Sequence, residues 1–133
     1  MIVLDTHALV WWVNGGSELS TDAAAAIKRE QISEDGIILV SSISAWEIAM
    51  LVGRGRLTLT MNIDDWLETV GEIPGVRFVP VDNEIGVEST RLPGEFHKDP
   101  ADRIIVALAR HFNIPLVTAD DKIRAYRHAH TIW

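Results

Sequence analysis

The feature that most constrains this chain is a set of short apolar runs in which apolar and polar residues do not alternate. Strands with this pattern are buried on both faces, as in a parallel sheet. The runs cover residues 2–4, 37–40, 76–79 and 115–118, and residues 130–133 are expected to add an edge strand. Helical segments separate the runs, so we predict an α/β fold with a central parallel sheet of about five strands and helices on both faces.

Helix-capping residues mark where the segments between the strands begin. The predicted caps are Ser20, Ser44, Asn62, Asp82 and Asp99. The expected helices cover residues 8–13, 21–32, 45–52, 63–70, 83–90, 100–112 and 121–126. Because no repeat and no linker interrupts this order, residues 1–133 are expected to form a single domain.

Charge and composition exclude several classes of protein. The chain has 12 Lys and Arg residues against 19 Asp and Glu residues, which gives a formal net charge of −7. So acidic a protein does not attract a phosphate backbone or an anionic membrane unless its charges are segregated or cations lie among its carboxylates. No apolar run reaches the roughly 18 residues of a transmembrane helix, so no membrane partner is expected. Cysteine is absent, which excludes thiolate chemistry and fits a cytoplasmic location.

Four acidic side chains are expected to gather at one edge of the predicted sheet. Asp5 follows the first strand, and Asp120 follows the fourth. Glu47 lies on the helix after the second strand, and Asp102 lies in the first turn of the helix before the fourth. Ligands of open α/β sheets bind beyond the carboxyl ends of the strands, which is where these residues are placed.

Each carboxylate also has a simpler interpretation. Asp5 caps the helix that follows it, and Asp120 forms an Asx turn at the start of the next one. Asp99 and Asp102 suit the N-cap and the third position of a single helix. Glu47 is harder to explain, because it is the only charged residue of an apolar helix and Glu is rarely buried unless it is paired or binds a metal. Its simpler interpretation is a side chain that reaches solvent through a gap in the packing.

Four carboxylates at one sheet edge repel one another at pH 7 unless they are protonated or share a cation. An all-carboxylate set suits a hard divalent cation such as Mg²⁺ or Mn²⁺. Such ions support phosphoryl transfer with a metal-activated water. The position of the acids therefore predicts a metal site with this chemistry.

Four segments of the chain resemble, in order, the acidic motifs of PIN-domain ribonucleases, and most closely those of the VapC-type toxins of prokaryotic toxin–antitoxin pairs. The segments are 4–9 (LDTHAL), 46–49 (WEIA), 97–103 (HKDPADR) and 117–120 (VTAD). Each motif alone is weak evidence, but the order and spacing of all four are specific. The resemblance covers nearly the whole chain.

This resemblance implies Mg²⁺- or Mn²⁺-dependent cleavage of RNA. The residues that match the catalytic and metal-binding acids of the family are Asp5, Glu47, Asp102 and Asp120. Asp99 matches a further acidic metal ligand of one subfamily, and Thr6 and Thr118 match hydroxyl residues that orient the acids. Because Asp99 precedes Pro100, we expect Asp99 to be the N-cap and Asp102 to be the main ligand. The family also implies a homodimer and a tight complex with a small antitoxin of the VapB type.

Two other functions fit parts of the sequence. A receiver-like signalling module has an acidic pocket on a similar sheet, with two adjacent acids after its first strand and a lysine after a late one. Here Thr6 follows Asp5, and Asp120 stands where the lysine is expected. The second alternative is a PIN-like domain that only binds partners, and the complete set of four acids argues against it.

The remaining candidate residues are interpreted mainly as structural. His7 is expected to be a structural histidine rather than a substrate contact. Trp11 and Trp12 are expected to form core or dimer contacts rather than a platform for bases. Arg54 and Arg56 fit phosphate contacts and a solvated turn equally well.

Overall fold

A single parallel sheet of five strands forms the centre of the molecule, as the apolar runs predict. The structure is a computed structural model that describes residues 1–133. Its strands are β1 (Ile2–Leu4), β2 (Ile38–Ser41), β3 (Val76–Val79), β4 (Leu116–Val117) and β5 (Thr131–Ile132). The strands lie in the order β3-β2-β1-β4-β5, and every neighbouring pair is parallel.

The register of the central strands aligns the carboxyl ends of β1, β2 and β4 at one edge of the sheet. Leu4 of β1 lies level with Val40 of β2 and with Val117 of β4. The residues that follow these three therefore leave the sheet side by side. The chain also changes direction across the sheet here, because β2 lies on one side of β1 and β4 on the other. Open α/β sheets bind ligands at such a switch point.

Seven helices connect and cover the strands, and each predicted helix is present. They are α1 (Thr6–Val13), α2 (Thr21–Ile32), α3 (Ser42–Gly53), α4 (Ile63–Gly71), α5 (Asn83–Thr90), α6 (Pro100–Phe112) and α7 (Asp121–Arg124). The caps Ser20, Asn62, Asp82 and Asp99 are confirmed, since each side chain accepts a backbone N–H of the first turn. α1 begins at Thr6, two residues earlier than predicted.

The start of α3 corrects the sequence interpretation. Ser41, the last residue of β2, is the N-cap, and its Oγ accepts the Ile43 amide at 3.2 Å. Ser44, which was the predicted cap, is fully buried inside the helix. The reason is that β2 continues into α3 without a connecting loop, which a search for caps between separate elements does not anticipate.

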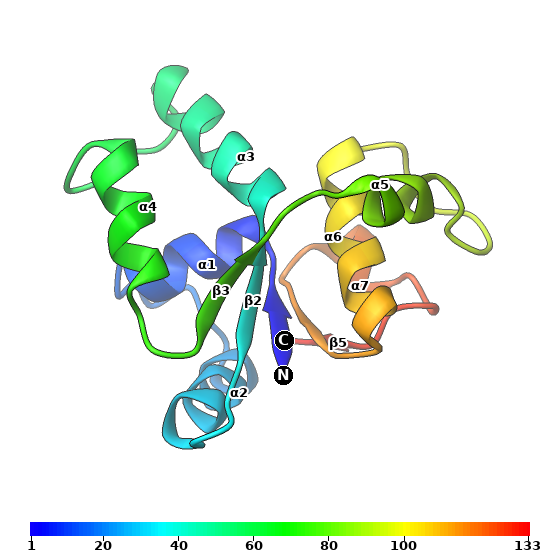
Figure 1. Ribbon diagram of the computed structural model, residues 1–133, viewed down its shortest axis with the longest axis horizontal. Helices are drawn as coiled ribbons and strands as arrows, with labels where there is room; N and C mark the ends of the chain where they lie inside the picture. Colours follow the sequence, from blue (N-terminus) through cyan, green and yellow to red (C-terminus); the bar gives the residue numbers. More distant parts are fainter.

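Two hydrophobic cores cover the two faces of the sheet, which explains why the strands are apolar throughout. On one face, Leu4 and Val40 pack against α1, α2, α3 and α4. On the other face, Val3, Leu39 and Leu116 pack against α5, α6 and α7. Figure 1 shows α1, α2 and α4 on one side of the sheet and α5, α6 and α7 on the other. Helices on both faces are therefore confirmed.

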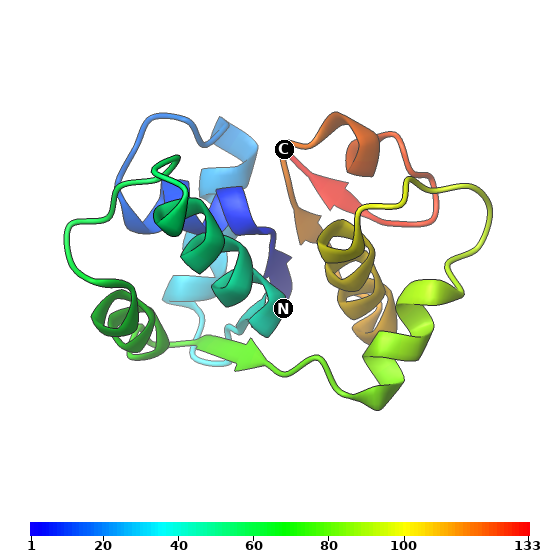
Figure 2. The same cartoon turned by 90° about the horizontal axis from the view of Figure 1, so that it is seen from above.

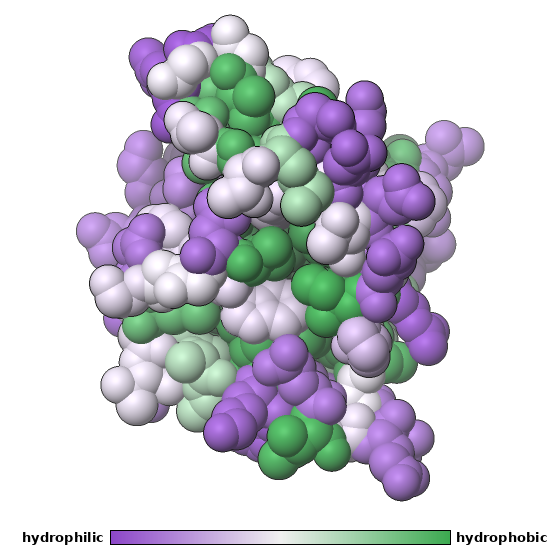
Figure 3. Space-filling view, turned by 90° about the vertical axis from the view of Figure 1, so that its left-hand side faces the viewer, coloured by the Kyte–Doolittle hydropathy of each residue, from purple (hydrophilic) through white to green (hydrophobic).

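Seen from above, α3 and α6 lie on either side of the upper end of β1 (Figure 2). The side of the molecule that carries α4 shows small hydrophobic groups near its middle, bordered by hydrophilic side chains (Figure 3). None of the seven helices combines the length and the apolarity that crossing a membrane requires.

Candidate active site

Asp5 is buried between the end of β1 and the start of α1, with only 6% of its surface exposed. Its Oδ1 accepts the Ala8 amide at 2.9 Å, so it caps α1 as its simpler interpretation proposed. Its Oδ2 accepts a hydrogen bond from the Thr118 hydroxyl. Burial raises the pKa of this carboxyl, and these two hydrogen bonds lower it in part. Asp5 is therefore both a helix cap and a fixed carboxylate at the switch point.

Thr118 links the ends of β1 and β4. Besides donating to Asp5, its hydroxyl oxygen accepts the backbone N–H of Asp120 at 3.0 Å. Asp120 in turn caps α7, where its Oδ1 accepts the Ile123 amide at 3.0 Å. The hydroxyl of Thr118 is buried, whereas Asp120 is exposed at the surface of the site. A single buried hydroxyl thus orients one carboxylate and the backbone that carries a second.

Glu47 on α3 reaches the same edge from the other side of β1. Its Oε1 accepts the Thr6 hydroxyl at 2.5 Å, and the Thr6 oxygen lies 2.8 Å from the Ser44 hydroxyl. Because Thr6 has one proton and donates it to Glu47, Ser44 is the donor to Thr6. Burial raises the pKa of Glu47, the Thr6 hydrogen bond lowers it, and Asp99 and Asp5 raise it further. Ser44 therefore supports the site rather than capping the helix.

Asp99 and Asp102 occupy the first turn of α6. Asp99 is the N-cap and is exposed, with its Oδ1 accepting the Asp102 amide at 3.0 Å. Asp102 is half-buried. Burial is the largest cause that raises its pKa to about 7, followed by the negative charges of Asp99, Asp120, Glu47 and Asp5. The acids that raise the pKa of Asp102 are the other four candidate carboxylates, and the ends of β1 and β4 and the starts of α3 and α6 place all five at one edge of the sheet.

Comparison with known proteins identifies the family. The PIN domain model matches residues 2–129. The chain belongs to the PIN-domain family. This PIN domain is 34% identical over 134 aligned residues to Ribonuclease VapC22 of Mycobacterium tuberculosis (strain ATCC 25618 / H37Rv). The alignment covers 99% of this chain and 98% of that protein. Family membership rules out the receiver-like alternative.

Solved structures with lower sequence identity share the fold of this PIN domain. VapBC2 from Rickettsia felis, bound to a DNA fragment, aligns with a TM-score of 0.69 at 17% identity over 98% of this chain and 97% of that one. VapC20 from Mycobacterium tuberculosis, described as a Sarcin-Ricin loop cleaving toxin, aligns with a TM-score of 0.67 at 18% identity over 96% and 95%. At these identities the likeness concerns the fold alone.

The PIN domain carries one site residue, His97, that the sequence interpretation did not assign. Its Nε2 lies 3.0 Å from Oδ2 of Asp102, and one nitrogen of its ring lies within 4.8 Å of carboxylate oxygens of both Asp102 and Asp120. The close pair is not aligned as a hydrogen bond, so the buried Nε2 has no hydrogen-bond partner. Its sequence signal was its place in segment 97–103, beside the acids.

Arg103 fixes the loop that carries His97. Its guanidinium donates to the carbonyl oxygens of Ser89 at 2.8 Å, Phe96 at 3.1 Å and His97 at 3.3 Å. Two of these hydrogen bonds hold the preceding loop against α6, which also carries Asp102, and the third holds α5 there. The basic residue next to Asp102 in the sequence therefore positions the site without itself facing the carboxylates.

His7, the predicted structural histidine, lies in the first turn of α1. It is exposed, and its ring contacts that of Trp11 in a tilted arrangement, with the centroids 5.6 Å apart. Burial raises the pKa of Asp5 and Glu47, and the nearby His7 lowers it again in part. The early start of α1 explains this position, because it places His7 in the first turn of the helix at the open edge of the sheet.

The donor set of this PIN domain fits a divalent cation. The carboxylate oxygens are hard ligands, and their repulsion falls when a cation lies among them. The buried, unpaired Nε2 of His97 adds a nitrogen donor beside Asp102 and Asp120. Asp102, Asp120 and His97 are the most closely grouped, whereas Asp5, Glu47 and Asp99 lie outside that 4.8 Å group.

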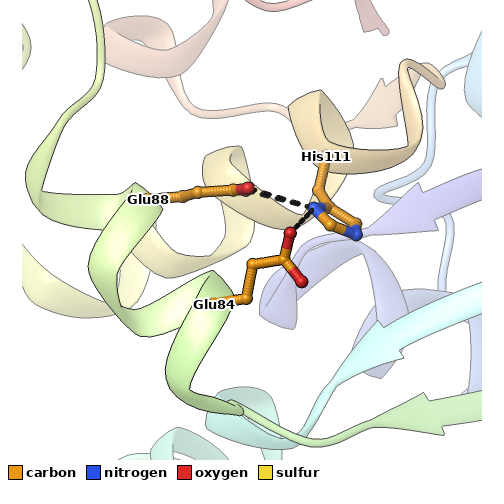
Figure 4. A group of neighbouring side chains, drawn as sticks. All are labelled: Glu84, Glu88 and His111. Atoms are coloured by element: carbon orange, nitrogen blue, oxygen red, sulfur yellow. Dashed lines mark hydrogen bonds and ion pairs between the residues drawn. The ribbon is translucent and has the colours of Figure 1, made fainter.

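A second group of potential metal ligands lies at the other end of α6 (Figure 4). Glu84 and Glu88 on α5 point toward His111, whose Nδ1 lies 3.9 Å from the first carboxylate and 3.2 Å from the second. Glu84 and His111 are exposed at the surface, and the three residues form an ion-pair network between the two helices. This group holds α5 against α6 and lies apart from the acids that follow the strands.

Proposed function

We propose that this PIN domain is a metal-dependent endoribonuclease, the toxin of a VapBC-type toxin–antitoxin pair. The observation that carries the proposal is the gathering of Asp5, Glu47, Asp99, Asp102 and Asp120 at one edge of the sheet, where burial and the other four charges raise the pKa of Asp102 to about 7. A protein keeps so many acids in one place when they bind a cation. The relative at 34% identity is itself named a ribonuclease.

Mg²⁺ or Mn²⁺ is the cofactor that suits this site. The residues that would hold it are Asp5, Glu47, Asp99, Asp102 and Asp120. A bound divalent ion would supply a water activated for attack on a phosphodiester and stabilise the charge that develops on the phosphate and the leaving oxygen.

The protein's own residues orient and protect this chemistry. Thr6 and Thr118 donate to Glu47 and Asp5 and so fix the direction of two carboxylates. Such preorganisation matters because the ligands need not rearrange when charge develops in the transition state. The RNA strand lies along the open edge of the sheet, where Asp120 and Asp99 face solvent.

The decisive experiment is cleavage of a random-sequence RNA pool by the purified protein. We expect cleavage with Mg²⁺ or Mn²⁺, none with EDTA, and none by Asp5→Asn, which removes one charge at nearly constant volume. A DNA pool of the same length is the control for substrate class. If the protein binds RNA but leaves it intact with either metal, it is a binding protein and the nuclease proposal is wrong.

The same proposal names the protein partners. We expect the protein to act in the cytoplasm as a homodimer. We also expect a small VapB-like antitoxin, encoded beside this gene, to bind it and stop RNA cleavage. Light scattering of the purified chain tests the dimer. Co-expression with the neighbouring short reading frame, followed by purification through a tag on one chain, tests the complex.

A further inference from the structure

Trp46 is the one tryptophan of this chain whose side chain is mostly exposed. It has 57% of its surface exposed. The rings of Trp11 and Trp133 contact each other at a tilt of 53°, with their centroids 5.7 Å apart. Trp12 and Trp66 pack in the core on the face covered by α1 to α4. Covering an exposed ring of this size is favourable, because it removes apolar surface from water.

A cavity of about 350 Å³ connects Trp46 with the acids of the candidate site. Ile43, Trp46, Glu47 and Met50 recur along α3 at the spacing of one helix face and form one wall. The first turn of α6, from Asp99 to Ala101, forms the other wall. The indole ring and two of the five clustered carboxylates therefore line the same space.

The charges of the cavity restrict what can lie on the indole ring. Glu47 and Asp99 at its border disfavour a phosphate or an acidic side chain there. A nucleobase is flat, aromatic and uncharged, so it gains stacking on an indole without this repulsion. Arg54 is the C-cap of α3, four residues beyond Met50, and forms no ion pair. Its guanidinium is therefore available to contact the phosphate backbone of the RNA that carries this base.

From this arrangement we infer that Trp46 is a substrate-binding residue, which stacks on the base of a nucleotide beside the cleaved phosphodiester. The inference rests on the proposed ribonuclease function and assigns the RNA strand a path from the acids along α3 toward Arg54. Stacking on an aromatic face is tolerant of base identity. Trp46 thus supplies binding that an acidic protein does not obtain from phosphate contacts.

Single-turnover cleavage by Trp46→Ala and Trp46→Phe tests the inference, with an RNA chosen from the pool that the wild type cuts. For Trp46→Ala, we expect the RNA concentration at half-maximal rate to rise about tenfold, as loss of one stacked base predicts. The maximal rate and the metal dependence should stay unchanged, and Trp46→Phe should recover most of the affinity. Phe112→Ala is the matched control, because Phe112 is an exposed aromatic (44%) at the other end of α6.

Substrates that lack one base identify the stacking partner. At one position beside the cleaved bond, an abasic nucleotide should weaken binding to the wild type as much as Trp46→Ala does. The same abasic RNA should bind wild type and Trp46→Ala equally. If the two changes instead add at every position, Trp46 does not stack on a base and the inference is wrong.

Two further outcomes separate this inference from the proposed function. If the wild type cuts RNA and Trp46→Ala has the same half-maximal concentration, the stacking inference alone fails. Should that variant also resist the antitoxin, the cavity belongs to a protein partner instead. If the wild type cuts no RNA, the proposed function fails and the stacking inference fails with it. A circular-dichroism melt confirms that each variant is folded.

Discussion

The helix α6 has a histidine beside carboxylates near each of its ends, and the two groups look alike by distance. Near the first turn, Nε2 of His97 lies 3.0 Å from Oδ2 of Asp102. Near the last turn, Nδ1 of His111 lies 3.2 Å from Oε1 of Glu88. Each group also includes a further carboxylate within 4.8 Å.

The two groups differ in what surrounds them. Asp102 is half-buried, and four other carboxylates lie close enough to repel its charge. Burial, followed by this repulsion, raises its pKa to about 7. Glu88 instead belongs to an ion-pair network that is open to water, where charges are screened and contribute little. Closeness of a histidine to carboxylates is therefore a weak sign of a metal site. Burial and the number of like charges are the stronger signs, because both disfavour ionised carboxylates unless a cation lies among them.

The comparison is tested most strongly by neutralising one carboxylate in each group. Glu47→Gln keeps the volume but removes a charge at the sheet edge, so we expect cleavage to fall on the order of 10²–10³-fold. The fold should stay intact or become more stable, because one repelling charge is gone. Glu88→Gln is the matched control and should cleave like the wild type. Equal single-turnover rates for both variants on one RNA would contradict the distinction.

The two acids at the start of α6 separate capping from metal binding. Asp99 is exposed and accepts the Asp102 amide, a role that Asn also fills, so Asp99→Asn should keep part of its activity. Asp102→Asn loses a charge beside His97 and should be nearly inactive. The measurement is single-turnover cleavage across a Mg²⁺ or Mn²⁺ titration. An inactive Asp99→Asn beside an active Asp102→Asn would reverse the assignment.

Metal binding should stabilise one end of α6 and not the other. At a metal concentration tenfold above Kd, mass action adds about 1.4 kcal/mol to the free energy of unfolding. For a chain of this size that raises Tm by roughly 3–5 °C over the value in EDTA. We expect Asp102→Asn to lose this increase and His111→Asn to keep it. A shift that disappears only in His111→Asn would place the metal between α5 and α6.

The pH dependence of the metal-free protein tests the same carboxylate without a cation. The pKa of Asp102 is about 7 in the folded protein and 3.8 by its ordinary value, so the folded state binds this proton more tightly. Its contribution to stability is complete below pH 3.8 and is lost as the pH rises through about 7. In EDTA, Tm should therefore fall less between about pH 5 and about pH 8 for Asp102→Asn than for the wild type. Glu88→Gln should follow the wild type; equal slopes for all three proteins would show that Asp102 is not desolvated.

Local patterns along the chain were enough to predict the sheet, every helix and the gathering of the acids. The physical reason is that a cap is formed by residues close together in the sequence, and that a strand buried on both faces needs a continuous apolar run, which is visible in the sequence. Parallel strands also end at one edge, so Asp5 and Asp120 had to lie near each other once the strand order alternated with helices. Their capping roles and their place in the cluster turned out to be compatible, since Asp5 uses one oxygen for each.

The supporting contacts depended on residues far apart in the sequence, and only the packed molecule revealed them. Ser44 and Thr6 are 38 positions apart, and their hydrogen bond exists because α1 and α3 leave adjacent strands. His97 lies against Asp102 because Arg103 holds the loop that carries His97 against α6. The exposure of Trp46 likewise follows from how α3 meets α6, since periodicity places it on a helix face but does not say what covers that face.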